Sequence, residues 1–352
     1  IGDMTSTQEA YKDPEKNIGE VVLDVRDLRT YLYTRWGITK AVDGLNFQVR
    51  AGETLGIVGE SGCGKSMTAL SLLRLAPKPA ARTVSGQIFL EGEDILERSE
   101  SEMRFIRGQK ISMILQDPMT SLNPVFTVGN QMVEGLGLYY GEEDSKSLKG
   151  RAVDILRRMG VAAPDRRVMD YPHQMSGGMK QRVVGAMAIS GTPKVLICDE
   201  PTTALDVTIQ AQYLRLLKQV QADTGVAIIF ITHDMGVVAK MCDRVMVMYA
   251  GKVVETGDIR PLFQNPSHPY TKALMASVPS MEHAHVDKLY SIEGQPPALF
   301  DLPAGCRFAN RCEFVDDRCI AEYPPMYASE EGHTADCWRL EGDWKKVAEA
   351  ES

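Results

Sequence analysis

The most constraining feature of this sequence is the segment at residues 59–66, GESGCGKS, which matches the pattern G-x-x-x-x-G-K-[ST]. It follows the apolar run Thr54–Val58 and precedes a helical pattern at residues 67–75, which is the strand–loop–helix context that a P-loop requires. In such a loop, backbone N–H groups surround the phosphates of a nucleotide, and the helix N-terminus adds its dipole. A glycine-rich turn without a ligand is the alternative, and the combined context makes it far less favoured.

Two side chains of this loop have expected roles of their own. Lys65 should reach the β- and γ-phosphates, and the Ser66 hydroxyl should bind Mg²⁺. The sequence therefore predicts a Mg·ATP site. The phosphate-binding residues that it predicts are Gly59, Ser61, Gly62, Gly64, Lys65 and Ser66.

A second motif places two acids at the end of an apolar run. Residues 195–198 (VLIC) precede Asp199 and Glu200, and a buried strand would deliver these carboxylates to the edge of the sheet where α/β folds bind ligands. Asp199 suits the surroundings of Mg²⁺, and Glu200 suits a general base that polarises the attacking water. Such a run is commonly a strand that enters a turn, but after a P-loop it indicates hydrolysis.

The pattern along the chain predicts an α/β fold with two additions. Strand-like runs alternate with helical patterns over residues 21–257. Residues 117–175 show little strand signal, which predicts an inserted helical subdomain, and the first twenty residues are expected to be a flexible tail. Clustered prolines after Gly257 predict a linker and a small C-terminal module at residues 258–352. The expected strands are Thr54–Val58, 111–115, 195–198, 226–231 and 245–249, and the expected helices follow Lys65, Lys180 and Val207 or lie near 128–139 and 146–159.

Charge and hydropathy exclude several classes of function. The net charge of −8 argues against nucleic acid as a partner, because phosphate backbones are bound by basic surfaces. The most apolar stretch, residues 226–231, has only the length of a strand, far short of a bilayer-spanning helix. The polar first twenty residues lack a signal-peptide core. A cytosolic protein is therefore expected.

Between the two motifs lies a third, MSGGMKQR at residues 175–182. Alone, Ser176 with Gly177 and Gly178 would be an ordinary helix N-cap with a flexible approach. In this order it resembles the LSGGQ signature of ATP-binding cassette (ABC) ATPases. The sequence departs from that signature at Met175 and Met179, whereas the serine and glycines expected to contact phosphate are present.

Further landmarks of the resembled family follow in order. Gln116 resembles the Q-loop glutamine that senses Mg²⁺ and water, and His233 resembles the switch histidine that contacts the γ-phosphate. Asp206, in the segment ALD at residues 204–206, resembles the D-loop aspartate near the partner subunit. The resemblance covers residues 21–257 and implies a head-to-tail dimer with ATP between the P-loop of one subunit and the Ser-Gly-Gly of the other.

The resemblance also implies an aromatic side chain that stacks on adenine. Tyr31, Tyr33 and Trp36 all lie in the first strand region, and spacing to the P-loop does not choose among them. Each is also compatible with ordinary packing. Tyr33 is the residue predicted here.

Three segments resemble the dipeptide/oligopeptide group of ABC importers. They are QDPMTSLNP at residues 116–124, HPYTKAL at 268–274 and LPAGCRFANRC at 302–312. The resemblance implies a second, identical or more commonly different, ATPase subunit, two membrane permease subunits, an extracytoplasmic solute-binding protein and a peripheral position on the cytoplasmic face of the cell membrane. Nickel, sugars, opines and glutathione remain alternative solutes. Non-transport ABC ATPases acting on DNA are disfavoured, since residues 66–176 lack the sustained heptads of their long coiled coils. Those acting on ribosomes usually carry two cassettes in one chain, whereas this sequence has one nucleotide-binding motif.

Four of the seven cysteines gather near the C-terminus, at Cys306, Cys312, Cys319 and Cys337. In a reducing compartment such a cluster indicates metal binding before disulfides. Zinc sites favour tight C-x2-C pairs, which this spacing lacks, whereas longer loops can hold an iron–sulfur cluster. The resembled group implies a [4Fe-4S] cluster here, with a structural role. Four reduced cysteines without metal, and zinc, remain the alternatives.

Overall fold

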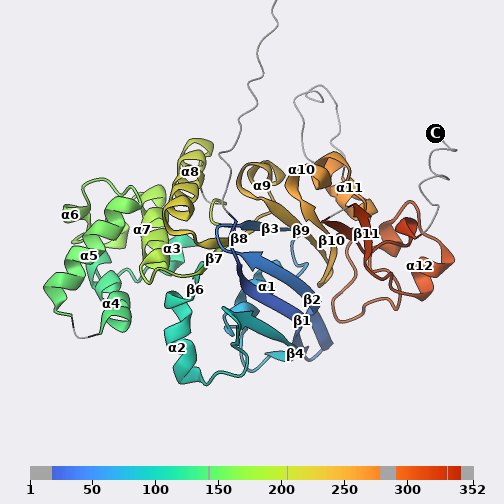
Figure 1. The fold of residues 1–352 in the computed structure, drawn as a ribbon, viewed down its shortest axis with the longest axis horizontal. Helices are drawn as coiled ribbons and strands as arrows, with labels where there is room; N and C mark the ends of the chain where they lie inside the picture. Colours follow the sequence, from blue (N-terminus) through green and yellow to red (C-terminus); the bar gives the residue numbers. More distant parts are fainter. Residues whose placement is uncertain (1–17, 142, 204, 278–290, 331, 342–352) are drawn as a thin grey trace, which may run out of the picture.

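The computed structural model describes residues 18–141, 143–203, 205–277, 291–330 and 332–341. Most of the expected N-terminal tail, part of the expected linker and the last residues of the chain lie outside these ranges. In the described part, two β-sheets form the centre of the molecule (Figure 1), with strand orders β11-β12-β10-β9-β3-β8-β7-β6 and β2-β1-β4-β5.

The strands have the following bounds. The larger sheet contains β3 (Thr54–Val58), β6 (Ile111–Ile114), β7 (Val195–Asp199), β8 (Ala227–Ile231), β9 (Arg244–Tyr249), β10 (Lys252–Asp258), β11 (Tyr327–Glu330) and β12 (His333–Ala335). The smaller sheet contains β1 (Val21–Thr34), β2 (Gly37–Arg50), β4 (Ala81–Leu90) and β5 (Glu93–Asp94).

The helices lie between and around these strands. They are α1 (Lys65–Leu72), α2 (Glu100–Gln109), α3 (Pro118–Ser121), α4 (Val128–Tyr140), α5 (Ser145–Arg158), α6 (Pro164–Arg167), α7 (Gly177–Ile189), α8 (Val207–Thr224), α9 (Met235–Met241), α10 (Ile259–Gln264), α11 (Pro269–Ala276) and α12 (Asp317–Ala321), with short 3-10 turns η1 (Pro172–Gln174), η3 (Ala309–Arg311) and η4 (Trp338–Leu340).

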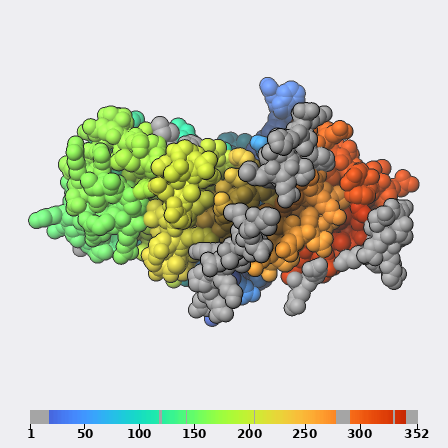
Figure 2. Space-filling model, turned by 90° about the horizontal axis from the view of Figure 1, so that it is seen from above, coloured from blue at the N-terminus to red at the C-terminus, as the bar shows by residue number. Residues whose placement is uncertain are grey.

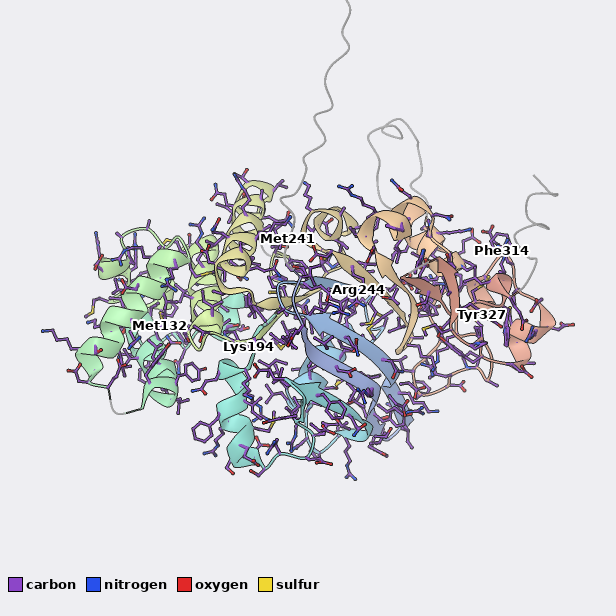
Figure 3. The ribbon with its side chains drawn as sticks, in the orientation of Figure 1. Met132, Lys194, Met241, Arg244, Phe314 and Tyr327 are labelled. Carbon is purple, nitrogen blue, oxygen red and sulfur yellow. The ribbon has the colours of Figure 1, made fainter. Side chains whose placement is uncertain are left out.

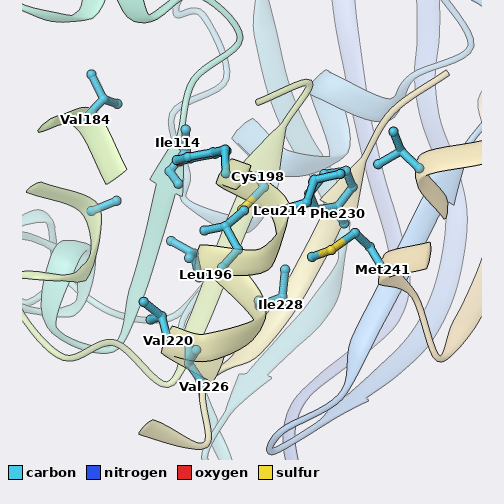
Figure 4. Close-up of a cluster of buried hydrophobic side chains, with 14 of the residues drawn as sticks. Ile114, Val184, Leu196, Cys198, Leu214, Val220, Val226, Ile228, Phe230 and Met241 are labelled. Carbon is cyan, nitrogen blue, oxygen red and sulfur yellow. The ribbon is translucent and has the colours of Figure 1, made fainter. Parts of the chain in front are cut away.

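The centre of the larger sheet is parallel and buried on both faces. β3 pairs in parallel with β8 and β9, and β7 pairs in parallel with β6 and β8. Because side chains alternate along a strand, Leu196 and Ile228 face a core shared with α7 and α8 (Figure 4), whereas Ile197 and Ile229 face a second core under β1 and β2. Burial on both faces explains why these strands are continuous apolar runs in the sequence.

The five strands expected from the sequence are present as β3, β6, β7, β8 and β9, with ends that differ by one residue at most. The expected helices are present as α1, α4, α5, α7 and α8. Helix α7 begins at Gly177 rather than after Lys180, because Ser176 accepts a hydrogen bond from the Met179 N–H at 3.4 Å and caps it.

Helices α3 to α7 occupy one end of the molecule. The described residues after β10, from Ile259 onward, are called the C-terminal segment here, and this segment occupies the other end (Figure 1, Figure 2). Met132 of α4 lies at the helical end, and Phe314 and Tyr327 lie at the opposite end (Figure 3). Thr127 and Asp144 cap α4 and α5 through their side-chain oxygens, which fixes where these helices begin.

The C-terminal segment joins the larger sheet. β12 pairs antiparallel with β10 and β11 pairs with β12, with Glu255 opposite Ala335. The module expected at residues 258–352 therefore shares its sheet with the strands of the nucleotide-binding core. At the other end of the described chain, Gly19 and Glu20 of the expected tail exchange backbone hydrogen bonds of 2.9 Å with Ala51.

Candidate nucleotide site

The P-loop leaves β3 and enters α1 in a backbone shape that requires glycine. Gly59 has φ 149° and Gly64 has φ 111°, values that L side chains rarely adopt. A Cβ at Gly59 would lie 2.2 Å from the Met248 carbonyl oxygen, and one at Gly64 would lie 2.1 Å from the Ala41 oxygen. The loop is therefore packed directly against backbone, which fixes the direction of its own N–H groups.

Lys65 and Ser66 lie at the first turn of α1, where the loop meets the acids of β7. The Lys65 ammonium donates to the carbonyl oxygens of Gly59 (2.7 Å) and Glu60 (2.9 Å) and is nearly buried. Burial raises the pKa of Asp199, and the Glu200 charge adds to this, while the Ser66 hydrogen bond and the Lys65 charge oppose it. The structure thus brings together the residues that the sequence assigned to phosphate and Mg²⁺.

Glu200 is the centre of a cluster of polar side chains. Its carboxylate accepts hydrogen bonds from Gln116 Nε2 (3.0 Å) and Thr203 Oγ1 (3.1 Å), and it lies 3.2 Å from His233 Nδ1. The three predicted hydrolytic residues, Gln116, Glu200 and His233, therefore meet at one point. Each lies just beyond the end of a parallel strand: β6, β7 or β8.

The position and charge of Glu200 are both constrained. Its φ of 46° lies in the left-handed region, a strained conformation that persists at functional sites when neighbours impose it. Its N–H donates to the Ile231 carbonyl oxygen at 2.9 Å, which helps to impose it. Partial burial would raise the pKa of Glu200, but His233, Thr203 and Lys65 hold it below its ordinary value. Glu200 is therefore ionised at neutral pH.

The signature residues belong to a second region of the surface. Ser176 and Gly177 start α7, and a Cβ at Gly178 would lie 2.8 Å from Ile209 Cγ2 in α8. Asp206 caps α8 by accepting from the Thr208 and Ile209 N–H groups. The described contacts thus join the predicted signature residues to the start of α8, close to Asp206, rather than to the P-loop of the same chain.

The three candidate adenine-stacking residues differ in how their side chains are bound and exposed. The Tyr31 hydroxyl donates to Asp43 at 2.6 Å, which ties Tyr31 into the fold. Tyr33 is 44% exposed and Trp36 is 70% exposed, with the guanidinium groups of Arg82 and Arg35 over their respective rings. Tyr33 is therefore partly exposed at the surface, and its stacking role stays a prediction.

The four C-terminal cysteines share one small cavity, although they come from separate loops and turns. Burial raises the pKa of Cys306 to about 12 and that of Cys337 to about 11, and neighbouring cysteine charges add to both shifts. Among the described residues, no three His, Cys, Asp or Glu side chains are arranged to hold a metal ion. The number of thiols thus fits the expected iron–sulfur cluster, but the described side chains are not already arranged around a metal position. The cavity is lined by these cysteines and by His268, Phe308, Phe314 and Trp338, among others.

Several residues that contact the site have no signal in a single sequence. Thr203 touches Glu200, and Glu60 in the P-loop contacts Tyr270 and Arg311 from the C-terminal segment. The resemblance at residues 268–274 marked the neighbourhood of Tyr270, but not its contact with the P-loop.

A loop built for phosphates beside an ionised carboxylate that can polarise water is the arrangement of a nucleoside-triphosphate hydrolase. Comparison with known proteins narrows this class. The profile of the family described as "ABC transporter" matches residues 42–203, and that of "Oligopeptide/dipeptide transporter, C-terminal region" matches residues 254–319. The chain belongs to the ABC transporter ATP-binding proteins of the oligopeptide/dipeptide group, and it is an ATPase.

Individual relatives agree over nearly the whole chain. A probable peptide ABC transporter ATP-binding protein of Sinorhizobium fredii is 51% identical, covering 91% of this chain and 95% of its own. The oligopeptide transport ATP-binding protein OppD of Bacillus subtilis is 47% identical, covering 94% and 92% respectively. A bacterial ABC transporter cassette solved as a dimer superposes with a TM-score of 0.60 at 25% identity, covering 68% of this chain and 99% of that one.

Within the described ranges, no helix has both the length and the apolar character needed to cross a bilayer.

Proposed function

We propose that this chain couples Mg·ATP binding and hydrolysis to the import of peptides through membrane subunits. The observation that carries the proposal is the Glu200 carboxylate, ionised and held by Gln116, Thr203 and His233 beside the P-loop. Glu200 accepts a proton from, or orients, the water that attacks the γ-phosphate. His233 would contact the γ-phosphate, and Gln116 would link the metal and water to the helices that follow it.

The residues at the end of β7 fit a Mg²⁺ ion. Asp199 is 4% exposed, and its Oδ1 atom is buried without a hydrogen-bond partner among the described residues. Such an orphaned carboxylate oxygen suits a hard cation or its bound water. Ser66, Asp199 and Gln116 would hold Mg²⁺, which neutralises developing charge on the phosphates. The chain itself fixes the positions of these oxygens and would place the Lys65 ammonium near the same phosphates.

Replacing Glu200 tests the hydrolytic assignment. Glu200→Gln should keep nucleotide binding but lower the ATPase rate by about 10²-fold or more, because the amide cannot accept the proton. The variant should accumulate as an ATP-bound dimer in size-exclusion chromatography. Lys65→Ala is the matched contrast, since it should weaken nucleotide binding itself. Near-normal turnover by Glu200→Gln would remove Glu200 from its role.

The signature residues are proposed to act in trans. Ser176, Gly177 and Gly178 would contact the phosphates bound by the partner ATPase, and Asp206 would face that partner. Support comes from the contacts that join this region to α8 instead of to its own P-loop. The partner would be a second ATPase subunit. We propose that it differs from this chain, with an identical subunit as the alternative.

Helices α3 to α6, within residues 117–175, are proposed to form the family's helical subdomain. Gln116 contacts Glu200 and directly precedes this region, so nucleotide-driven movement there can reach two membrane permease subunits. The division into residues 1–20, 21–257 and 258–352 is part of the same proposal. The chain would lie peripherally on the cytoplasmic face of the membrane, with an extracytoplasmic solute-binding protein in the full system and no nucleic acid.

The substrate assignment rests on relatives. Proteins named for peptide and oligopeptide transport cover more than nine-tenths of this chain, so peptides are proposed as the solute. Nickel, sugars, opines and glutathione are the other candidates, since the solute is selected by other subunits. Uptake of labelled di- and tripeptides by a strain lacking this gene, compared with the complemented strain, separates these cases.

A [4Fe-4S] cluster held by Cys306, Cys312, Cys319 and Cys337 is proposed for the C-terminal segment. The supporting observation is the single cavity that all four thiols line. Such a cluster would cross-link separate loops, a structural task. Anaerobic purification should yield brown protein with about four iron and four sulfide per chain, and Cys312→Ser should bleach it. Colourless, iron-free protein contradicts the proposal, and zinc at one per chain would identify the alternative.

A further inference from the structure

Glu60, the second residue of the P-loop, is bound from two sides by residues of the C-terminal segment. Its backbone N–H donates to the Tyr270 hydroxyl at 2.9 Å. Its carboxylate accepts two hydrogen bonds from Arg311, with Nη1–Oε2 at 2.7 Å and Nη2–Oε1 at 3.0 Å. This paired geometry is the strongest form of carboxylate–guanidinium contact.

Arg311 is itself held rigidly. Its side chain is 2% exposed, and it also donates to the carbonyl oxygens of Ile292 (3.3 Å) and Glu293 (2.9 Å) and to the Tyr249 hydroxyl (3.2 Å). The Tyr249 and Tyr270 rings lie 4.6 Å apart. An arginine fixed by this many partners loses little additional freedom when it binds Glu60.

The same segment also contacts strand β2 and lies beside the P-loop. Leu299 accepts a hydrogen bond from the Lys40 N–H at 2.9 Å, and Arg307 is paired with Asp43. Pro296, Pro297 and Leu299 line a hollow whose other wall is the P-loop at residues 60–63. Residues 292–311 therefore form a layer that packs against both β2 and the P-loop.

Glu60 connects this layer to the phosphate-binding lysine. The Glu60 carbonyl oxygen accepts from the Lys65 ammonium at 2.9 Å, so the peptide groups on both sides of Glu60 are hydrogen-bonded. The charge of the carboxylate also reaches the interior of the loop: burial raises the pKa of the Cys63 thiol, Lys65 opposes this rise, and Glu60 adds a smaller one. An unpaired negative charge here would oppose the binding of a triphosphate.

We propose that Arg311 and Tyr270 are positioning residues for ATP. Arg311 neutralises Glu60 and fixes its side chain, Tyr270 fixes the Glu60 N–H, and together they hold the P-loop ready for phosphate before nucleotide arrives. The C-terminal segment is thus part of the nucleotide site, and its folding and ATP affinity are coupled.

Equilibrium binding of the slowly hydrolysed analogue AMP-PNP with Mg²⁺ to the purified full chain tests this proposal. Arg311→Met should raise the Kd about tenfold, equivalent to ~1.4 kcal/mol, and the KM for ATP should rise by a similar factor while kcat changes less. Arg311→Lys, which keeps the charge but loses the paired geometry, should fall between Arg311→Met and the unaltered chain. Arg318→Met is the matched control, because Arg318 pairs with Glu341 in an exposed ion pair of the same segment.

A second substitution separates positioning from simple stability. Glu60→Gln combined with Arg311→Met should bind within about threefold of the unaltered chain, since the unpaired charge is gone. A purely structural role predicts the opposite: lower Tm, unchanged Kd and no rescue. If Arg311→Met does not fold, Tyr270→Phe tests the proposal instead, since it removes only one oxygen atom. It should raise the Kd for AMP-PNP about threefold, equivalent to roughly 0.7 kcal/mol.

A folded Arg311→Met or Tyr270→Phe chain with unaltered affinity would overturn the inference. So would a failure of Glu60→Gln to restore binding to Arg311→Met. The inference rests on ATP binding but not on the transported solute, so peptide uptake can fail while these affinities still behave as stated.

Discussion

Glu255 is a fully buried carboxylate of β10 that accepts three hydrogen bonds. Its Oε1 atom contacts the Ser267 N–H (2.7 Å) and His333 Nε2 (2.6 Å), and its Oε2 atom accepts from the His268 N–H (2.9 Å). These bonds tie β10 to the start of α11 and to β12. Because α11 carries Tyr270, they also support the contact with the P-loop.

Glu255→Gln changes almost no volume but replaces one acceptor oxygen with an NH₂ group. In either amide orientation, at least one backbone N–H of Ser267 or His268 then faces a donor. A hydrogen bond to a charged group contributes about 1.5–3 kcal/mol, and an unsatisfied buried donor costs about 1–3 kcal/mol. A loss of about 3 kcal/mol is therefore expected. At about 2.1 cal/mol/K per residue, this corresponds to a fall in Tm of about 4 °C if the chain unfolds as one unit.

Differential scanning calorimetry of the unaltered chain and Glu255→Gln measures this fall. Glu97→Gln is the control, since Glu97 is an exposed glutamate in the loop before α2 and should shift Tm by well under 1 °C. A shift below 1 °C for Glu255→Gln as well would refute the reasoning, because it would mean that the three contacts contribute nothing net.

Two further predictions concern coupling and acid stability. Crosslinks from the membrane subunits should map mainly to residues 117–141, and mapping to the P-loop face instead would reverse the proposed orientation. Burial alone would raise the pKa of Asp43, but the Tyr31 hydrogen bond and Arg307 lower it, so its stabilising effect is present above about pH 4 and lost as the pH falls through the lowered pKa. Asp43→Asn should therefore be less stable than the unaltered chain at pH 7, with a difference that shrinks below about pH 4 in thermal melts. A pH-independent difference would contradict this.

Local motifs explain why much of the site could be predicted from sequence. Glycines in the P-loop and acids after an apolar run mark their positions within a few residues, because the backbone shape and strand end that they need are local. Parallel strands then bring Gln116, Glu200 and His233 to one sheet edge. The central strands were equally visible, since burial on both faces leaves an uninterrupted apolar run.

Other features have no local signal. Strands β1 and β2 were not predicted individually, because their outer faces carry charged residues and their pairing contains several register shifts. The Glu60–Arg311 contact joins residues 251 positions apart, and neither side chain differs from an ordinary surface charge in the sequence. The pairing of β12 with β10 could not be predicted either, because β12 has only three residues, too few for a recognisable strand pattern.

The short strands β12 and β11 have a consequence for any attempt to produce the ATPase core alone. β10 is bonded on one side to β9 and on the other to β12, and the Val254 carbonyl oxygen also accepts from the Asp336 N–H at 2.8 Å. A chain ended near residue 258 would leave this row of backbone groups open, and an open strand edge is a template for intermolecular pairing. The C-terminal segment thus protects the sheet from self-association, which makes it as relevant to solubility as to the nucleotide.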